Sequence, residues 1–216
     1  SGMTFNSYDE EISYDRNGNI TDLVRNGAYD GDFMALEIDR LVYTYHPQKK
    51  NQLMKVLDYT FSPQGFKDDS LDGNTDPEDD YDYDAHGNMI LDQNKGITQI
   101  IYNHLNLPTK IIFGSESNKI EYLYDAAGKK VQKLVTEAGT PKYYSYLQGF
   151  QYKGKALLFF PTAEGYVNYT PAVYGGSLEN QTVITPESYN YVFNYTDHLG
   201  NIRLSYGLDP ATNVLK

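Results

Sequence analysis

A five-residue pattern, Tyr-Asp-x-x-Gly, recurs along this chain and constrains its fold more than any other feature. It stands in the segments YDRNGNI, YDAHGNM and YDAAGKK, and a fourth copy, TDHLGNI, has Thr in place of Tyr. Weaker copies begin at Tyr45 and Tyr102. The recurring residues are Tyr14, Asp15, Gly18 and Asn19; Tyr83, Asp84, Gly87 and Asn88; Tyr124, Asp125 and Gly128; and Asp197, Gly200 and Asn201. Such repetition predicts a repeat architecture in which each copy is one small structural unit.

One copy of the pattern predicts one β-hairpin. Apolar residues alternate before the third copy, with Ile120, Tyr122 and Tyr124 on one side of the chain, and a period of two predicts a strand. The Asp that follows can accept hydrogen bonds from backbone N–H groups two residues on, as in an Asx turn. The Gly supplies the positive φ that a tight hairpin or bulge requires. We therefore expect Tyr to end a strand, Asp to close the turn and Gly to reverse the chain.

The segments between the copies predict further strands. The runs with this character are residues 34–45, 53–61, 97–102, 110–113, 131–135, 142–146, 156–160 and 165–169. Residues 35–42 are the best candidate for a helix, but they lead directly into Tyr43 and Tyr45, so a strand is favoured. Two segments interrupt the pattern. Residues 62–80 are acidic and poor in apolar side chains, and residues 174–187 are rich in Gly and polar residues, so both are predicted as loops.

The predicted fold class is all-β, with antiparallel hairpins in one curved, partly rolled sheet. Residues 1–61 are expected to hold degenerate hairpins, residues 62–80 an acidic surface loop, and residues 81–147 the regular repeats. Residues 148–216 are expected to hold divergent hairpins that end in the segment DHLGNIRL. Together they are predicted to form one continuous structural domain.

Composition narrows the classes of function. The 22 tyrosines among 216 residues, with no Trp, suit half-buried strand faces whose hydroxyl groups reach water or backbone. The formal net charge of −11 argues against nucleic acid and anionic membranes as partners. The absence of Cys excludes disulfides, thiolate metal sites and Cys nucleophiles. No apolar run approaches the ~18 residues that a membrane-spanning helix needs.

The chemistry-bearing residues do not form a recognisable site. Asp72, Asn74 and Asp76 resemble the start of a calcium loop, but Pro77 and Tyr83 occupy the positions where that motif has Gly and Glu. The four histidines, His46, His86, His104 and His198, lie at or beside repeat turns and are not spaced as metal ligands. No GxSxG segment or phosphate-binding loop occurs. We predict no catalytic residue, no metal ligand and no cofactor.

Several segments together resemble one family. YDYDAHGNMILDQNKGI, EYLYDAAGKKVQK and the final YTDHLGNIRLSY resemble the YD repeats of Rhs and wall-associated proteins, which teneurins share. They look most similar to large surface Rhs proteins of Bacteroides-like bacteria. The resemblance implies antiparallel β-ribbons that wind into a shell, which can enclose a C-terminal toxin and is not itself catalytic. This chain has few repeats and stops before residues that resemble the family's autoproteolytic core, so it is expected to be a wall segment.

The resemblance therefore implies a structural, non-catalytic segment of a large secreted or cell-surface protein. Its expected partners are other segments of the same protein, with self-association through exposed strand edges as a further expectation. Two alternatives remain open from the residues alone. Exposed tyrosines beside Asp and Asn suit a module that binds carbohydrate or a protein partner. Carboxylates paired in space would suit a hydrolase.

Overall fold

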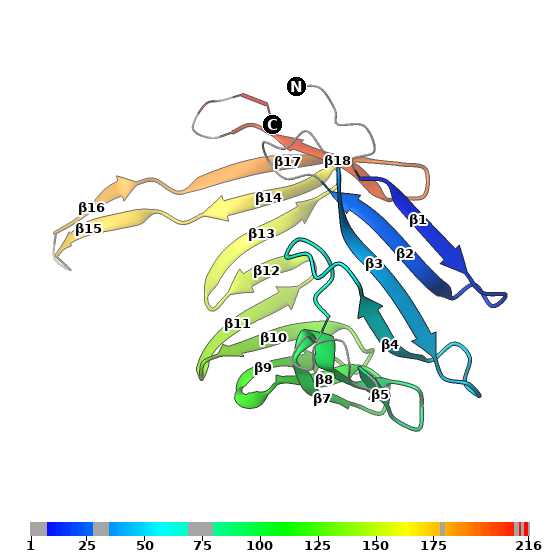
Figure 1. The fold of residues 1–216 in the computed structure, drawn as a ribbon. Coiled ribbons are helices and arrows are strands. Elements are labelled where there is room, and N and C mark those ends of the chain that lie inside the picture. Colours follow the sequence, from blue (N-terminus) through cyan, green and yellow to red (C-terminus); the bar gives the residue numbers. More distant parts are fainter. Residues whose placement is uncertain are drawn as a thin grey trace. The chain divides into compact units, whose positions relative to one another are not determined.

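The computed structural model describes residues 8–27, 35–68, 80–177 and 180–209, together with residues 212, 214 and 215. The chain divides into two compact units, Ser1–Lys119 and Ile120–Lys216. The described strands are antiparallel, and the element between β6 and β7 is a short 3-10 helix (Figure 1). The all-β prediction is confirmed, including the strand rather than helix that was favoured for residues 35–42. Among the described residues, no helix is both long and apolar enough to cross a membrane.

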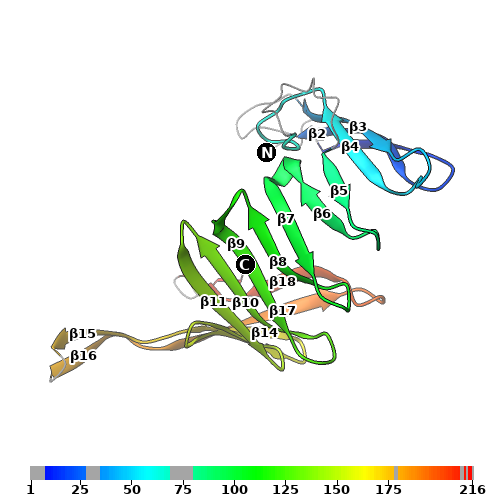
Figure 2. The ribbon, with the colours of Figure 1, turned by 90° about the horizontal axis from the view of Figure 1, so that it is seen from below.

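The first unit contains two sets of strands. The elements are β1 (Glu10–Tyr14), β2 (Ile20–Gly27), β3 (Leu36–Tyr45), β4 (Leu53–Asp58), β5 (Tyr81–Tyr83), β6 (Met89–Asp92), η2 (Gln93–Lys95), β7 (Ile97–Tyr102), β8 (Pro108–Phe113) and the start of β9 (Ser115–Tyr124). Strands β1 to β4 form a four-stranded sheet in chain order. Strands β5 to β8 lie side by side in chain order, as Figure 2 shows, and begin a second sheet of twelve strands.

The second unit continues the twelve-stranded sheet and adds a separate ribbon. Its strands are the end of β9, then β10 (Lys130–Glu137), β11 (Thr140–Leu147), β12 (Phe150–Lys153), β13 (Ala156–Thr162), β14 (Gly165–Thr170), β15 (Val173–Ser177), β16 (Asn180–Thr185), β17 (Ser188–Thr196) and β18 (Ile202–Gly207). In the twelve-stranded sheet β14 pairs with β17, because β15 and β16 leave it to form a two-stranded sheet of their own. Figure 1 shows this pair as an arm beyond the ends of β14 and β17.

The arm corrects one sequence-based prediction. Residues 174–187 were expected to be a loop, yet β15 and β16 are paired strands. All six residues of β16 are exposed. A ribbon with no buried face needs no alternation of apolar and polar residues, so the period-two signal is missing where the strands exist. The central part of the predicted acidic loop, residues 69–79, lies outside the described residues.

The core of the first unit is small. Leu41, Val56 and Tyr81 are buried together, and partly buried side chains pack around them, among them Leu23, Tyr43, Leu53, Phe66, Tyr83 and Met89. In the second unit Val167 is fully buried. Aromatic contacts do much of the remaining packing there, as in the stacked rings of Phe150 and Phe160, whose centroids are 5.3 Å apart. Thin sheets with this little buried area depend on accurate turns to hold the strands in register.

The recurring glycines have the backbone conformation that such turns need. The φ angles are +86° at Gly18, +85° at Gly87, +80° at Gly128 and +84° at Gly200. A side chain at Gly87 would have open space, since no other atom lies within 4 Å of the place that a Cβ would occupy. Any cost of substitution at Gly87 is therefore conformational rather than steric.

Gly87→Val is expected to lower the free energy of unfolding by about 1–3 kcal/mol, because a β-branched residue resists positive φ. Gly87→Asn is the matched control and should cost less, since Asn106 adopts φ +57° at the equivalent place in the turn between β7 and β8. Urea unfolding of the three proteins measures both changes. Equal stability of the Val variant and the wild type would contradict the turn geometry.

Candidate functional site

The turn between β5 and β6 illustrates what the recurring residues do. The carboxylate of Asp84 accepts hydrogen bonds from the backbone N–H groups of His86 (2.8 Å) and Asn88 (2.9 Å), and from the Asn88 side-chain amide (2.9 Å). Two backbone bonds complete the turn, from Gly87 N to Asp84 O (3.0 Å) and from Asp84 N to Asn88 O (2.9 Å). The carboxylate thus satisfies donors that the reversal of the chain leaves without strand partners.

The same arrangement recurs in the other copies. Asp15, Asp125 and Asp197 each accept from the backbone N–H groups two and four residues later, at 2.8–2.9 Å. In the weaker copy Asn103 takes the role of Asp, and its side-chain oxygen accepts from Leu105 N (2.9 Å) and Leu107 N (3.1 Å). The side-chain oxygen shared by Asp and Asn is therefore what the turn uses.

The hydrogen bonds of the turns also lower the pKa values of three turn aspartates. The pKa of Asp84 is lowered, chiefly by the hydrogen bond from the Asn88 side chain, and the pKa of Asp15 is lowered chiefly by that from Asn19. The pKa of Asp197 is lowered chiefly by the backbone hydrogen bond from Asn201. These aspartates are anionic at neutral pH and are already engaged as acceptors, so they are poorly suited to proton transfer.

The tyrosines of the first unit join each hairpin to the one before it. The Tyr45 hydroxyl donates to the carbonyl oxygen of Ile20 (3.0 Å). Tyr83 donates in the same way to Leu53 (2.7 Å), and Tyr102 to Met89 (2.7 Å). Each acceptor is the first residue of the return strand of the preceding hairpin. Burial raises the pKa of all three tyrosines, which keeps the hydroxyl groups protonated as donors.

The copies at the two ends of the repeat series differ in their tyrosines. Tyr14 belongs to the first hairpin, has 59% of its surface exposed and makes no hydroxyl hydrogen bond among the described residues. Tyr124 ends β9, and its ring centroid is 6.3 Å from that of Tyr122. In the last copy Thr196 stands at the motif position, paired with Ile202. The sequence pattern identified the Tyr position but gave no sign of the cross-hairpin bond, because its acceptor is a backbone carbonyl.

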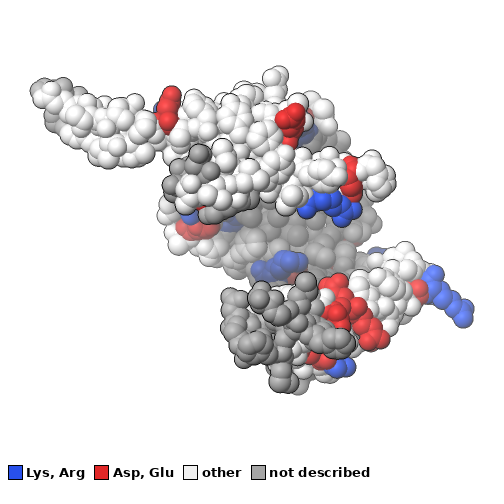
Figure 3. All heavy atoms as spheres, turned by 90° about the horizontal axis from the view of Figure 1, so that it is seen from above, with Lys and Arg blue, Asp and Glu red and all other residues white. Residues whose placement is uncertain are grey.

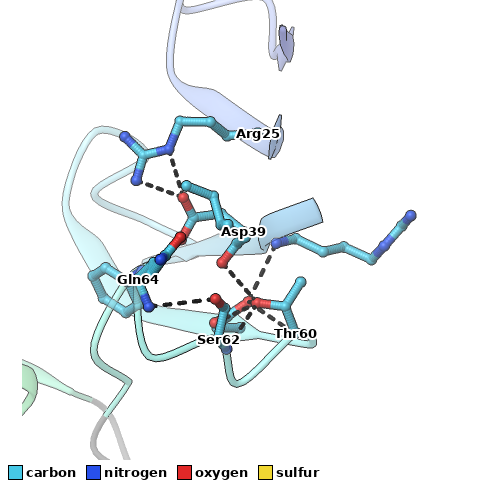
Figure 4. A network of polar contacts seen from close by, with 9 residues as sticks. Arg25, Asp39, Thr60, Ser62 and Gln64 are labelled. Atoms are coloured by element: carbon cyan, nitrogen blue, oxygen red, sulfur yellow. Dashed lines mark hydrogen bonds and ion pairs between the residues drawn. The ribbon is translucent and has the colours of Figure 1, made fainter. Parts of the chain in front are cut away.

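The described part of the first unit also contains four buried aspartates: Asp39, Asp58, Asp80 and Asp92. Figure 4 shows Arg25 directed at Asp39, whose carboxylate accepts a hydrogen bond from Arg25 Nε (2.6 Å). The same carboxylate accepts a hydrogen bond from Phe66 N (2.5 Å). Asp58 accepts from Arg40 N (3.2 Å) and from the backbone and hydroxyl of Thr60, both at 3.0 Å. The carboxylates of Asp39 in β3 and Asp58 in β4 thus accept hydrogen bonds from the backbone of the loop that follows β4.

The other two buried carboxylates have the same kind of role. Asp80 accepts from Val56 N (2.7 Å) and from the Asn94 amide (3.0 Å), and burial raises its pKa. Asp92 caps the 3-10 helix by accepting from Lys95 N (3.1 Å) and forms an ion pair with Lys95 Nζ (2.8 Å). Each of the four is held by donors of the first unit, which is the pattern of structural rather than catalytic carboxylates.

Metal-binding arrangements are not found in the described part of the chain. No group of three or more His, Asp or Glu residues gathers there in a way that could hold an ion. His46 Nδ1 accepts backbone hydrogen bonds from Gln48 (3.1 Å) and Lys49 (3.0 Å), so it orders its own turn. The calcium-like residues Asp72, Asn74 and Asp76 lie outside the described residues.

One open groove lies on the turn side of the first unit. It has a volume of about 710 Å³, and Asn17, Gln52 and His86 are among the residues that line it. Asn17 and His86 occupy the same position in two copies of the motif, the third residue after the Tyr. The sequence shows that the residue at this motif position differs between copies. The structure adds that Asn17 and His86, which both occupy it, line the same groove.

Comparison with known proteins gives no family assignment. No family model and no curated protein matches the sequence. Among solved structures, the Photorhabdus luminescens Tc holotoxin pore aligns with 13% identity and a TM-score of 0.48, and the TcdB2-TccC3 complex with 12% and 0.47. The TcdB2-TccC3-TEV complex gives 9% and 0.33. Each alignment covers 92% of this chain but only 9%, 9% and 14% of those chains. TM-scores below 0.5 leave a common fold unestablished.

Tyr83→Phe removes the hydroxyl that joins β5 to the preceding hairpin and leaves the Leu53 carbonyl without that donor. We expect the free energy of unfolding to fall by about 0.5–1.5 kcal/mol. Tyr14→Phe is the matched control, because the same atom is deleted where it makes no bond, and its effect should stay within about 0.5 kcal/mol. Urea unfolding of both variants measures the difference. Equal losses would show that the hydroxyl bond does not stabilise the array.

The turn aspartates and Asp80 are expected to respond to pH in opposite directions. Since the folded-state pKa of Asp84 is lowered, its stabilising contribution is present above the ordinary value of 3.8 and is lost as pH falls through the lowered pKa. The raised pKa of Asp80 means that folding favours its protonated form, so that contribution is lost as pH rises through the raised pKa. Carboxyl carbon NMR titration should give a midpoint below 3.8 for Asp84 and above 3.8 for Asp80. Asn88→Ala should bring Asp84 back toward 3.8, and an unchanged midpoint would contradict the assigned cause.

Proposed function

We propose that this chain is a structural, non-catalytic segment of a large secreted or cell-surface protein of the Rhs type. The observation that carries the proposal is the series of tyrosine hydrogen bonds from one hairpin to the preceding one. An array in which each unit depends on its neighbour is typical of repeat proteins that build extended surfaces. The buried carboxylates support the same reading, because each holds backbone or an ion-pair partner in place.

Other segments of the same protein are the proposed partners. β5 and β18 stand at the two ends of the strand order in the twelve-stranded sheet, so each has a side on which no strand of the described residues pairs with it in that sheet. Such an edge offers backbone N–H and C=O groups to a further strand. A neighbouring segment of the parent protein or a second copy of this chain would satisfy them. The secreted or cell-surface location follows from the resemblance of the motifs and is part of the proposal.

The charge distribution fits a structural role better than binding to a polyanion. On the described part of the face in Figure 3, Lys and Arg lie in small separate groups, several of them next to Asp or Glu. Nucleic acid binding depends on many lysines and arginines aligned along one surface. The net charge of −11 also disfavours binding to nucleic acid.

Adhesion through exposed tyrosines is the second candidate. Tyr189, Tyr191 and Tyr195 alternate along β17, and 51–66% of the surface of each is exposed. Alternation places them on one face of the sheet, where rings can contact a sugar or a protein. The nearby arm adds Tyr174, 58% exposed, and neither of its strands contains a charged residue. A glycan and protein array that retains the wild-type chain no better than Tyr191→Ala would remove this candidate.

The structural proposal is tested by finding the parent protein. Antibodies raised against this 24.6 kDa chain should detect a much larger polypeptide in the source cells. We expect that polypeptide in the medium or on the cell surface, where protease added to intact cells removes the signal. A cytoplasmic protein used as a loading standard should survive the same treatment. A band of 24.6 kDa inside the cells, or hydrolysis of a polysaccharide by the purified chain, would overturn the proposal.

A further inference from the structure

Charge is distributed unevenly between the two units of the chain. The first unit, residues 1–119, contains 10 Lys and Arg residues against 21 Asp and Glu residues, so it carries the whole net charge of −11. The second unit, residues 120–216, contains 8 basic and 8 acidic residues and is neutral overall. Like charge opposes contact between two copies of the first unit, whereas two copies of the second unit meet no such net repulsion.

The second unit presents an aromatic face on β14, β17 and β18, which are neighbours in the twelve-stranded sheet. Residues that pair directly across two strands share a face, and alternate residues along one strand do the same. The pairs on this face are Tyr189 with Tyr169, Tyr191 with Val167, Phe193 with Tyr206, and Tyr195 with Leu204. We refer to these eight residues as the tyrosine face.

The other face of the same strands is richer in amides and hydroxyls. Asn190 and Asn194 alternate with the tyrosines along β17, with Val192 between them. Ser205 pairs with Asn194, and its hydroxyl shares a hydrogen bond with the Asn194 side-chain oxygen (2.8 Å). A sheet with one more polar and one more apolar face commonly packs its apolar face against another layer.

The tyrosine face is largely open. Tyr189, Tyr191, Tyr195 and Leu204 have between 51% and 66% of their surface exposed. Since a large aromatic side chain has roughly 150–250 Å² to bury, these four side chains together expose roughly 400–500 Å². Contact between two such faces would bury roughly 800–1,000 Å², which is the size of a weak and reversible interface.

The chemistry of the tyrosine face is self-complementary. Rings already pack against rings on it, with centroids 5.2 Å apart for Tyr169 and Tyr189 and 5.6 Å apart for Phe193 and Tyr206. None of its eight residues is charged. The ring surfaces and phenolic hydroxyls of one copy are matched by those of another, and their contact buries no unpaired ion.

The charged groups nearest the tyrosine face lie at its ends. Glu187 precedes β17, and its carboxylate accepts a hydrogen bond from the Tyr169 hydroxyl (3.1 Å). Asp197 follows β17 and forms an ion pair with Arg203 (2.6 Å). Both carboxylates are therefore already engaged, and they border the apolar surface as the polar rim of an interface does.

We propose that the tyrosine face is a self-association surface, against which a second copy of this chain packs its own tyrosine face about a two-fold axis. A two-fold axis lets one patch serve both partners. The contact joins the units that are neutral overall, so the net charge of the first unit does not oppose it directly. This role is additional to the structural one and does not depend on an Rhs-type parent protein.

A second copy suits the tyrosine face better than an added strand or a charged partner. An added strand would pair with the backbone at the open edge of β18 and leave the face uncovered. An acidic or basic partner would meet no opposite charge among the eight residues. Packing of two aromatic sheet faces requires neither a free edge nor a charge.

The test is sedimentation equilibrium of the full chain over a range of concentrations, at low and at high salt. We expect a reversible monomer–dimer equilibrium with a dissociation constant of about 10–100 µM, as suits an interface of this size. The average mass should rise from 24.6 kDa toward twice that value. Added salt should tighten the dimer, because it screens the repulsion between two chains that each have a net charge of −11.

A pair of double variants locates the contact. Tyr195→Thr combined with Leu204→Thr removes one directly paired part of the face and keeps residues that suit strands, so the dissociation constant should rise roughly tenfold or more. Leu123→Thr combined with Tyr143→Thr is the matched control, since it removes the same exposed side-chain types from β9 and β11. The control should dimerise as the wild type does.

Dilution of the isotope-labelled wild type tests the same contact without a substitution. NMR signals of Tyr189, Tyr191 and Tyr195 should shift as the dimer dissociates, and those of Tyr143 in β11 should not. This measurement identifies the face even where the double variant melts at a lower temperature than the wild type.

The other outcomes overturn the proposal. A chain that stays monomeric at every concentration has no self-association surface, and a dimer that salt weakens is held by ion pairs. A dimer that persists in the Tyr195→Thr and Leu204→Thr variant, with no dilution shift at Tyr191, is formed elsewhere, as at the edge of β18. A monomer whose Tyr191 signal shifts with cellohexaose has a glycan site instead. The size and location of the parent protein are measured separately, by the antibody experiment.

Discussion

The fold depends on the hydrogen bonds between the turn aspartate and the backbone N–H groups that follow it. Sheets with so small a core gain little from packing, so the register of each hairpin must be set locally. The Asp carboxylate at the first turn residue sets the register, because it accepts hydrogen bonds from the backbone N–H groups two and four positions later. Asn103 does the same with an amide oxygen, which shows that acceptor geometry rather than charge is the requirement.

The tyrosine hydroxyl adds the connection between hairpins. In the first unit it extends from the end of one strand to the first return-strand carbonyl of the preceding hairpin. Phe could fill the same volume but could not make this bond, which gives a physical reason for Tyr at positions 45, 83 and 102. Local turn chemistry thus determines each hairpin, and the hydroxyl groups of Tyr45, Tyr83 and Tyr102 each join one hairpin of the first unit to the preceding hairpin.

The sequence predicted the parts of the fold that are encoded locally. The position of Gly87 in its turn and the alternation through Ile120 and Tyr122 were sufficient for an all-β prediction. The arm of β15 and β16 was missed because a ribbon exposed on both faces has no apolar period. The acceptor of Tyr83, the burial of Asp80 and the groove around Gln52 arise from contacts between distant segments, and a single sequence does not contain them.

The motif separates residues that build the turn from residues that face outward. Asp84, Gly87 and Asn88 are tied into the turn, whereas the position of His86 is filled by Asn17 in the first copy and Ala127 in the third. Both Asn17 and His86 line the open groove of the first unit. A repeat can therefore change its surface chemistry at this position without losing the hairpin. In this chain the residues that hold the turn and the residues that give its surface chemistry are therefore different members of the same motif.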